Sequence, residues 1–380
     1  MKKKIYADHA ATTKLSENAL EAMMPFLQEA YQNPSTLYSS ATQIKRKVTE
    51  AREIIAEVIN AKPEEIVFTS GGTESDNWAI KGIALRDLKK KQIVTTAIEH
   101  HAILNSCKML QEISGKVRYI LPDNQGIIEK NSLLEVLKQE TSLVSVMLVN
   151  NEIGTIQRIP ELVEVTHNKG ALFHTDAVQA VGHIPVDVDV LGIDLLSASA
   201  HKFNGPKGVG FLYLRDGVEL PSYINGGGQE RGKRAGTENV AGIVGMAVAL
   251  KENTDKLEEN MNKLSNLDIL FRDKLKICKV EYLLNGADQR IPGNISVSFK
   301  GLDGEVILHR MDLKGIEIAT GSACDSKKTQ VSHVLKAIGL SEEYARGTVR
   351  ISLGIDNTEE DIDIIATHLI QIVESMNESR

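Results

Sequence analysis

The sequence predicts an α/β protein that has a large domain, with a mainly parallel sheet flanked by helices, and a smaller α+β domain. Short apolar runs recur along the first two thirds of the chain, and stretches with helical periodicity separate them. Strands buried on both faces are continuous apolar runs, and helices between them provide the crossovers of a parallel sheet. A chain of 380 residues also exceeds one ordinary hydrophobic core, so two domains are expected.

The expected large domain begins with two amphipathic helices, at residues 16–29 and 41–59, in which apolar residues return with helical spacing. A short apolar strand at 65–69 comes next, and it is followed by a glycine turn at 70–73 and a helix at 74–88. Apolar runs then predict the remaining strands of this domain, at 93–97, 143–149, 171–174, 195–198 and 208–213.

The smaller domain is expected beyond a long charged helix at residues 251–275, which would connect the two parts. Strands at 294–299 and 349–353 and helices near 304–311 and at 359–374 give this part its α+β character. An N-terminal strand is expected to join it. The division that follows assigns residues 13–260 to the large domain and residues 1–12 with 261–380 to the small one.

The composition is typical of a soluble globular protein, with 42% hydrophobic and 25% charged residues. A formal net charge of −7 gives no overall reason to expect nucleic-acid binding. The apolar runs fall short of the ~20 residues that a membrane-spanning helix needs, and no apolar stretch follows the basic start to make a secretory signal. We therefore expect a cytoplasmic protein that makes no membrane contact.

The three cysteines differ in their surroundings. Cys107, Cys278 and Cys324 fit no zinc spacing and no disulfide framework, so no metal site is expected and a reducing cytosol is the simplest setting. Cys107 and Cys278 lie in apolar patterns, which is typical of buried, inert thiols. Cys324 lies in a polar segment, where Lys327 and Lys328 would lower the pKa of its thiol. Cys324 is therefore a candidate nucleophile.

A lysine and an aspartate at predicted strand ends indicate the chemistry most clearly. Lys202 follows the apolar segment 191–196 and precedes a turn rich in glycine and proline, where a loop would present its side chain. A partly desolvated lysine in such a place can form a Schiff base with an aldehyde cofactor. Asp176 ends another apolar strand, and an acid that pairs with a pyridinium nitrogen beside such a lysine is characteristic of pyridoxal phosphate (PLP) enzymes.

A glycine turn at the start of a predicted helix could bind the phosphate of this cofactor. Gly72 lets the backbone approach an anion, and Thr73 can cap the helix and offer a hydroxyl group. Ser199 and His201 flank the lysine and could contact the same phosphate. The alternative interpretation is an ordinary turn between a strand and a helix.

Other polar residues follow predicted strands at the same edge of the sheet. His100 could stack on a planar pyridine ring and move protons, and a structural histidine is the alternative. Asn151 could hydrogen-bond a ring hydroxyl or the substrate. Arg350 lies on an apolar strand and needs an anionic partner, either a substrate carboxylate or a structural acid. The glycine-rich segment 226–239 either faces a phosphate or a partner or is a mobile surface loop.

Taken together, these motifs resemble those of the NifS/IscS family of cysteine desulfurases, fold-type I PLP enzymes with a seven-stranded sheet. The resemblance covers nearly the whole chain, and the segment Gly321-Ser-Ala-Cys324 resembles a desulfurase rather than an aminotransferase. The matching motifs lie at residues 8–13, 33–35, 69–77, 99–100, 150–157, 175–179, 197–210, 226–239, 321–324 and 349–354.

The resemblance implies a role for each matching residue. Lys202 would bind PLP covalently, Asp176 would pair with its ring nitrogen, and Gln179 would contact its ring hydroxyl. Cys324 would attack the substrate sulfur and hold it as a persulfide, on a loop for which we expect weak or multiple conformations at 322–332. The phosphate ligands would be Gly72, Thr73, Ser199 and His201, joined by Thr237 from the second subunit of a dimer. His100 would be the stacking acid and base, and Asn33, Asn151 and Arg350 would orient the substrate.

The implied protein is a homodimeric, PLP-dependent enzyme that converts L-cysteine to L-alanine and passes sulfur from Cys324 to an acceptor protein. Iron–sulfur cluster assembly, tRNA thiolation and DNA phosphorothioation all begin with such an enzyme, and the sequence leaves them open. A selenocysteine lyase or a class V aminotransferase is the alternative on the same fold, and a scaffold that docks a sulfur acceptor is the alternative from another class. The sequence departs from the family motifs at Tyr38, Ala200, Asp325 and Val331. These departures leave open how the loop around Cys324 behaves and which protein accepts the sulfur.

Overall fold

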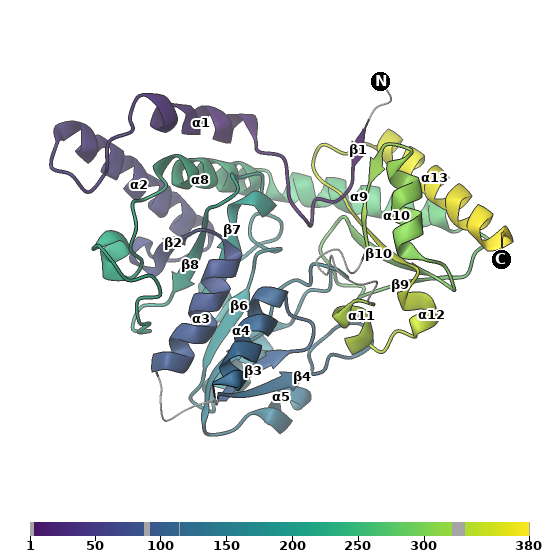
Figure 1. The fold of residues 1–380 in the computed structure, drawn as a ribbon, viewed down its shortest axis with the longest axis horizontal. Helices are drawn as coiled ribbons and strands as arrows, with labels where there is room; N and C mark the ends of the chain where they lie inside the picture. The colour runs from purple at the N-terminus through teal and green to yellow at the C-terminus, as the bar shows by residue number, and fades with distance from the viewer. Residues whose placement is uncertain (1–3, 87–91, 114, 321–330, 380) are drawn as a thin grey trace.

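The computed structural model describes residues 4–86, 92–113, 115–320 and 331–379 of the chain. Figure 1 shows two parts side by side, each with its own sheet, joined by helix α9 (Leu257–Leu275) and by the N-terminal segment. Among the helices so described, none is long and apolar enough to cross a membrane.

The sheet of the larger part is mostly parallel, which confirms the predicted α/β fold. Strand β8 is antiparallel to both of its neighbours, and the other paired strands are parallel. From one edge to the other, the seven strands are β2 (Ile66–Thr69), β8 (Gly210–Leu214), β7 (Leu195–Ser199), β6 (Leu172–Asp176), β5 (Thr141–Ser145), β3 (Gln92–Thr96) and β4 (Lys116–Ile120).

The helices of this part are amphipathic or buried segments that alternate with the strands along the chain. Ser16 caps the first of them by accepting a hydrogen bond from the backbone of Ala19, as expected for a serine at this position. In chain order they are α1 (Glu17–Gln28), α2 (Ser39–Val58), α3 (Gly72–Arg86), α4 (His101–Glu112), α5 (Lys130–Val136), α6 (Ile159–His167), α7 (Val188–Leu191) and α8 (Val240–Asp255).

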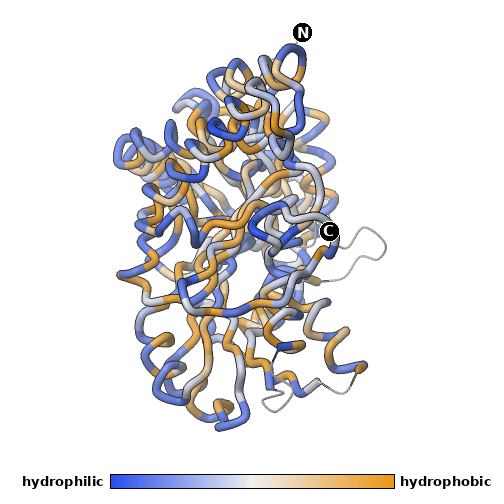
Figure 2. Tube along the Cα trace, turned by 90° about the vertical axis from the view of Figure 1, so that its left-hand side faces the viewer, coloured by the Kyte–Doolittle hydropathy of each residue, from blue (hydrophilic) through white to orange (hydrophobic). Residues whose placement is uncertain are grey.

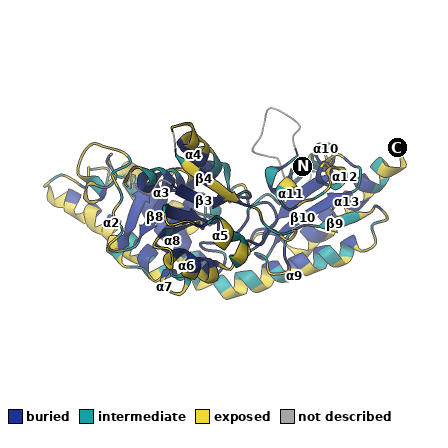
Figure 3. Ribbon diagram, turned by 90° about the horizontal axis from the view of Figure 1, so that it is seen from below, coloured by how far each residue is buried: buried dark blue, intermediate teal, exposed yellow. Residues whose placement is uncertain are grey.

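Both faces of the large sheet are buried, each by its own hydrophobic cluster. Successive side chains of a strand point to opposite faces, so Phe211 and Tyr213 of β8 belong to one cluster, and Leu212 and Leu214 to the other. Helices α3 and α4 cover one face, and α6, α7 and α8 cover the other (Figure 3). In Figure 2, hydrophobic stretches alternate with hydrophilic ones along the whole trace. Packing from both sides fixes the strand ends, from which the site residues extend.

The smaller part has an antiparallel sheet of four strands packed with helices, which agrees with the expected α+β character, although only two of these strands were predicted. Its hydrophobic cluster includes Phe271 of α9, Phe299 and Ile351 of the sheet, and Leu369 of the C-terminal helix. The strands are β12 (Ala319–Thr320), β13 (Thr348–Ser352), β10 (Asn294–Phe299) and β9 (Tyr282–Leu284). The helices are α10 (Gly304–Asp312), α11 (His333–Ala337), α12 (Glu342–Ala345) and α13 (Glu359–Glu378).

The N-terminal strand β1 (Ile5–Tyr6) pairs in parallel with β11 (Ile316–Glu317) of the smaller part, as expected. The division of the chain at residues 12 and 260 stays a prediction. The hydrophobic clusters follow it in most places, but a cluster of the large part also contains Ile291, Val334, Leu335, Ile338 and Ala345. Helix α11 therefore packs against the large part of the chain.

Two predicted elements differ from the structure. The single helix expected at 251–275 is two helices, α8 and α9, because the backbone at Lys256 leaves the helical region with φ −112° and ψ 17°. The strand expected at 143–149 ends at Ser145, although the backbone beyond it continues to bond β6 through the amide of Leu148 and the carbonyl of Asp176. We did not predict strand β4, whose exposed charged residues suit the edge of a sheet.

The glycine-rich segment 226–239 is anchored to the sheet by one buried ion pair. Both carboxylate oxygens of Glu230 accept hydrogen bonds from Arg52 of α2, at 2.6 and 2.8 Å, and one also accepts from the amide of Phe68 at 2.9 Å. The two side chains are only 12% and 5% exposed, for Arg52 and Glu230 respectively. These contacts therefore fix the middle of the segment 226–239 against β2.

We predict that Glu230→Ala lowers the free energy of unfolding by about 3 kcal/mol, because it leaves the Arg52 charge buried and uncompensated. Urea denaturation would measure the change. Glu50→Ala, which removes an exposed pair with Lys47, is the control and should have little effect. Equal stability of the Glu230 variant and the wild type would contradict the prediction.

Candidate active site

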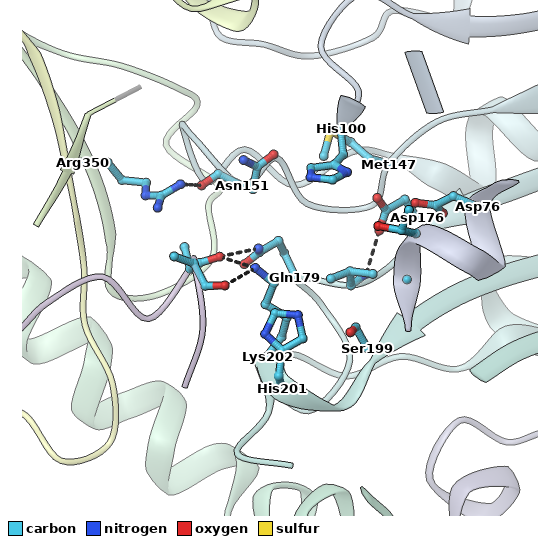
Figure 4. Close-up of a pocket in the computed structure, with 15 residues that line it drawn as sticks. Asp76, His100, Met147, Asn151, Asp176, Gln179, Ser199, His201, Lys202 and Arg350 are labelled. Carbon is cyan, nitrogen blue, oxygen red and sulfur yellow. Dashed lines mark hydrogen bonds between the residues drawn. The ribbon is translucent and has the colours of Figure 1, made fainter. Parts of the chain in front are cut away.

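The predicted site residues gather at the carboxyl ends of the parallel strands, where open α/β sheets bind ligands. A cavity of about 320 Å³ lies there, and Figure 4 shows its lining. Ten predicted residues line it, namely Gly72, Thr73, His100, Asn151, Asp176, Gln179, Ser199, His201, Lys202 and Arg350. The other lining residues are Ala10, Ala11, Asp76, Met147 and Val178, which sequence analysis did not single out.

Lys202 lies in a short turn directly after β7, as predicted, and its side chain extends along the cavity (Figure 4). Its Nζ donates hydrogen bonds to the backbone carbonyls of Ala10 at 2.6 Å and Ala11 at 2.8 Å. Gln179 Nε2 donates to the same carbonyl of Ala10 at 2.9 Å. The N-terminal segment therefore orients both side chains.

Asp176 is the last residue of β6 and is only 5% exposed. Its Oδ1 accepts a hydrogen bond from the amide of Val178 at 2.9 Å. Burial raises the pKa of this carboxyl group, whereas the positive charges of His100 and Lys202 and the hydrogen bond from Val178 oppose the rise. An acid in this place can receive a hydrogen bond from a cationic ring bound in the cavity.

His100 caps the start of helix α4, a position that sequence analysis did not assign to it. Its Nδ1 accepts a hydrogen bond from the amide of Ala102 at 3.1 Å, so the neutral ring carries its proton on Nε2. Burial lowers the pKa of His100, although the nearby Asp176 raises it in part. The neutral form of this ring at the cavity wall is therefore favoured at neutral pH.

The glycine turn before α3 makes a bare backbone cradle at the start of a helix. A Cβ on Gly72 would lie 2.5 Å from Cγ2 of Val178, and Gly71 has a φ of +144° that favours glycine. Thr73, Ser199 and His201 line an opening beside this turn. Free amides at a helix N-terminus and these side chains suit a phosphate group.

These features fit PLP. The bare backbone at Gly72 admits the phosphate, the buried Asp176 suits a ring nitrogen, and Lys202 has an amine beside the same cavity. Burial, together with the charges of Lys202 and Lys207, lowers the pKa of His201 to about 4, so its ring is neutral at neutral pH and can act as a hydrogen-bond partner rather than a cation.

Arg350 crosses from β13 of the smaller part to the cavity with a side chain 6% exposed. It donates to Oδ1 of Asp8 at 2.6 Å and to the carbonyl of Asn151 at 3.0 Å. Its Nε is buried and makes no hydrogen bond to any residue that the structure describes. The sequence left open a substrate carboxylate or a structural acid as its partner, and Asp8 is the acid that occupies this position.

Two predicted residues, Asn33 and Thr237, do not line the cavity, and a third lies outside the described residues. Asn33 is exposed, and its Oδ1 accepts from the amide of Ser35 in a local turn. Thr237 is exposed on the glycine-rich segment. Cys324 lies outside the described residues, as does most of the segment for which we expected weak or multiple conformations.

The structure describes the end of that segment, and its contacts are with the large part; the expected variability at 322–332 stays a prediction. Ser332 is 6% exposed and donates to Oε2 of Glu152 at 2.5 Å, while it also caps α11. The next residue, His333, contacts the backbone carbonyl of Glu99 through Nε2 at 2.9 Å. The chain is thus fixed beside His100 from Ser332 onward.

Asp76 is the most informative residue that sequence analysis missed. It lies one helical turn after Gly72 on α3, so that both residues face the same cavity. This spacing from the glycine turn was the available signal. Glu99, another buried acid, precedes His100, and burial raises its pKa to about 8.

The chain was compared with known proteins and structures. The class-V aminotransferase family matches residues 5–365. The cysteine desulfurase IscS of Clostridium botulinum (strain Hall) is 48% identical over 382 residues, which cover 100% of this chain and 96% of that protein. The solved structure of a NifS-like protein has a TM-score of 0.92 at 36% identity, covering 98% of this chain and 100% of the other. A structure of SspA in complex with cysteine has a TM-score of 0.83 at 37% identity, covering 93% of this chain and 99% of the other.

The low pKa of the buried His174 side chain predicts how the free energy of unfolding depends on pH. His174 is fully buried between Ser145 and Ser197, and burial lowers its pKa to about 3. The unfolded chain takes up a proton near the ordinary pKa of about 6.5, whereas the folded protein does not. The free energy of unfolding should therefore fall as the pH is lowered from about 6.5 towards about 3.

Urea denaturation at a series of pH values would measure this dependence. His174→Gln keeps a polar side chain between the two serines and should reduce the slope, because the titrating ring is gone. Ser145→Ala removes one partner of the same ring but keeps the histidine, and its slope should stay like that of the wild type. A His174→Gln variant with the wild-type slope would contradict the prediction.

Proposed function

The chain belongs to the NifS/IscS cysteine desulfurases of the class-V aminotransferase family, and from this premise we propose which of its residues perform the reaction. Cysteine desulfurases of this family are PLP-dependent sulfurtransferases. The observation that supports the proposal most directly is that Lys202, Asp176 and His100 line one cavity beside a glycine cradle. The proposed reaction converts L-cysteine to L-alanine and leaves the sulfur as a persulfide on Cys324.

In this proposal Lys202 attaches the cofactor, Asp176 pairs with its ring nitrogen, and Gln179 contacts its ring hydroxyl. When bound, PLP supplies an electron sink for negative charge that develops beside the amino group of the substrate. The phosphate would be held by the backbone at Gly72 and by the side chains of Thr73, Ser199 and His201. His100 would stack on the ring.

The substrate would be bound between the two parts of the chain. Arg350 would hold its carboxylate with the planar guanidinium group, whose buried Nε is oriented by the contacts with Asp8 and Asn151. Lys202 and His100 would move protons at the substrate carbon atoms. The amine and imidazole groups are suited to this task near neutral pH.

Sulfur transfer is assigned to the thiolate of Cys324. It would attack the sulfur of the bound cysteine and form an S–S bond while the C–S bond breaks. The electron pair of the broken bond stays with carbon, which takes up a proton to give alanine. The other two cysteines are poor candidates, because burial raises the pKa of Cys107 to about 12 and also raises that of Cys278.

We further propose a cytoplasmic homodimer in which Asn33 and Thr237 act at the cavity of the partner subunit. Both residues are exposed on the single chain. Large apolar side chains are exposed nearby in sequence on α1 and the loop after it, and such exposure suits an interface between subunits. They are Leu20, Met24, Leu27, Tyr31, Leu37 and Tyr38.

The sulfur acceptor is proposed to be a separate protein, of an iron–sulfur assembly or thiolation pathway. Affinity purification of the protein from its native host would identify it. An aminotransferase activity is the alternative on the same fold, and it needs no cysteine nucleophile.

Cys324→Ser is predicted to bind PLP and L-cysteine as the wild type does but to release no sulfide, because the hydroxyl group is a weak nucleophile at neutral pH. Absorbance of the cofactor and a sulfide assay would measure the two properties. Mass spectrometry of the wild type after turnover should find one extra sulfur on the peptide that contains Cys324. Sulfur on Cys107 or Cys278 instead, or transaminase turnover by the Ser variant, would overturn the proposal.

Arg350→Lys is predicted to raise the KM for L-cysteine at least about tenfold, a loss of ~1.4 kcal/mol, while PLP content stays near that of the wild type. An ammonium group cannot reproduce the planar contacts with Asp8 and the Asn151 carbonyl and still meet a carboxylate. Steady-state kinetics and the cofactor absorbance would check this. A variant that loses its fold or its PLP in proportion to its activity would favour a purely structural arginine.

A further inference from the structure

Asp76 is a buried acid of the cavity that the proposed reaction does not use. It lies on α3 with 1% of its surface exposed and lines the cavity beside Asp176 (Figure 4). Its Oδ1 is shielded from solvent and makes no hydrogen bond within the described part of the chain. A buried polar atom in this condition is costly, so the protonation state of the group needs an explanation.

The groups that face Asp76 are mostly acidic. Burial raises the pKa of Asp76 most, and the negative charge of Asp176 on β6 raises it further; an ionised Glu99 after β3 would add to this rise. His174 Nε2 lies 3.7 Å from Oδ1 of Asp76, but this ring is neutral because burial lowers its pKa to about 3. The nearby hydroxyl group of Ser197, which contacts His174 Nε2, opposes the rise in the pKa of Asp76.

Asp176 has the opposite surroundings. It accepts the amide hydrogen bond of Val178, and the charge of Lys202 also favours its ionised form. Two adjacent buried carboxyl groups cannot both be ionised at neutral pH. The proton of the pair therefore belongs on Asp76, and a protonated Asp76 donates a hydrogen bond that favours the anionic form of Asp176.

We infer that Asp76 is a neutral carboxylic acid that donates a hydrogen bond to Asp176 and holds this carboxylate in place to receive the ring nitrogen of the cofactor. Asp76 is thus a positioning residue that acts through Asp176. The inference rests on the proposed role of Asp176. The amide of Val178 and the carboxylic acid of Asp76 would hold Asp176 from two directions, which fixes its orientation before the cofactor binds.

The protonation of Asp76 can be tested on the apoprotein, independently of any activity. Infrared difference spectra would detect the carbonyl stretch of a neutral carboxylic acid at neutral pH. All variants are made in a Glu99→Gln background, because Glu99, with its pKa at about 8, also gives a neutral acid. The band should disappear in Asp76→Asn and remain in Asp176→Asn. A band that remains in Asp76→Asn, or no band in the parent protein, would overturn the inference.

The positioning role is tested by the dissociation constant of PLP, measured by absorbance titration. Asp76→Asn keeps a hydrogen-bond donor and should weaken PLP binding less than about threefold, whereas Asp76→Leu removes it and should weaken binding at least about tenfold. Thr95→Val is the control for loss of a buried polar group, because Thr95 Oγ1 is buried without a hydrogen bond among the described residues and does not line the cavity. Equal losses for the Asn and Leu variants would contradict the role.

The spectroscopic test decides the protonation state even if Asp76→Leu fails to fold, since Asp76→Asn is nearly isosteric. It also separates this inference from the proposed function. Loss of sulfur transfer to Cys324 would leave the infrared result unchanged, and a wrong protonation state would leave the assignment of Cys324 unchanged.

Discussion

The burial of three carboxyl groups at the carboxyl edge of one sheet is the constraint on which the rest of the site depends. Asp76, Asp176 and Glu99 are each at most 5% exposed. Such groups cannot all be ionised together, so the surroundings of each group determine which of them carries the negative charge. The amine of Lys202 lines the same cavity and favours the ionised form of Asp176, as does the hydrogen bond from the Val178 amide. The remaining acids then serve as hydrogen-bonding groups, as the contacts of Glu99 with the Met147 amide and Thr96 illustrate.

The smaller part of the chain contributes directly to this charge arrangement. Arg350 extends from its sheet into the cavity, and Asp8 in the N-terminal segment neutralises it. The same segment reaches Lys202 and Gln179 through its backbone. Binding of an amino acid would therefore involve groups from both sheets. This arrangement makes the relative position of the two parts important for the affinity of the substrate.

Much of the fold could be predicted because its signals are local. Apolar runs such as 195–198 lie within observed strands, and glycine at 72 marks the start of α3. The break at Lys256 was missed because nothing in the composition there interrupts helical periodicity, and only packing decides it. The partnership of Asp8 with Arg350, which are far apart in sequence, could not be predicted because it depends on the parallel pairing of β1 with β11.

Much of the candidate site, like much of the fold, could be predicted from the sequence. Lys202, Asp176 and His100 were found because each follows an apolar strand, and strand ends converge at one edge. Asp76 was missed because an acid on the first turns of a helix is usually explained by the helix dipole. Its burial depends on the contacts of α3 with the sheet.

The hydrogen bonds from Lys202 to Ala10 and Ala11 have a consequence for how such a site evolves. Both acceptors are backbone carbonyls, so any residue that preserves the local backbone would supply the same oxygen atoms. Substitution of Ala10 or Ala11 would therefore change the steric fit of the side chain but leave the hydrogen bonds from Lys202 to the backbone carbonyls in place. Replacing a backbone amide by an ester in the N-terminal segment would alter the contact itself. Side-chain replacement along the N-terminal segment would therefore reveal little about these two hydrogen bonds.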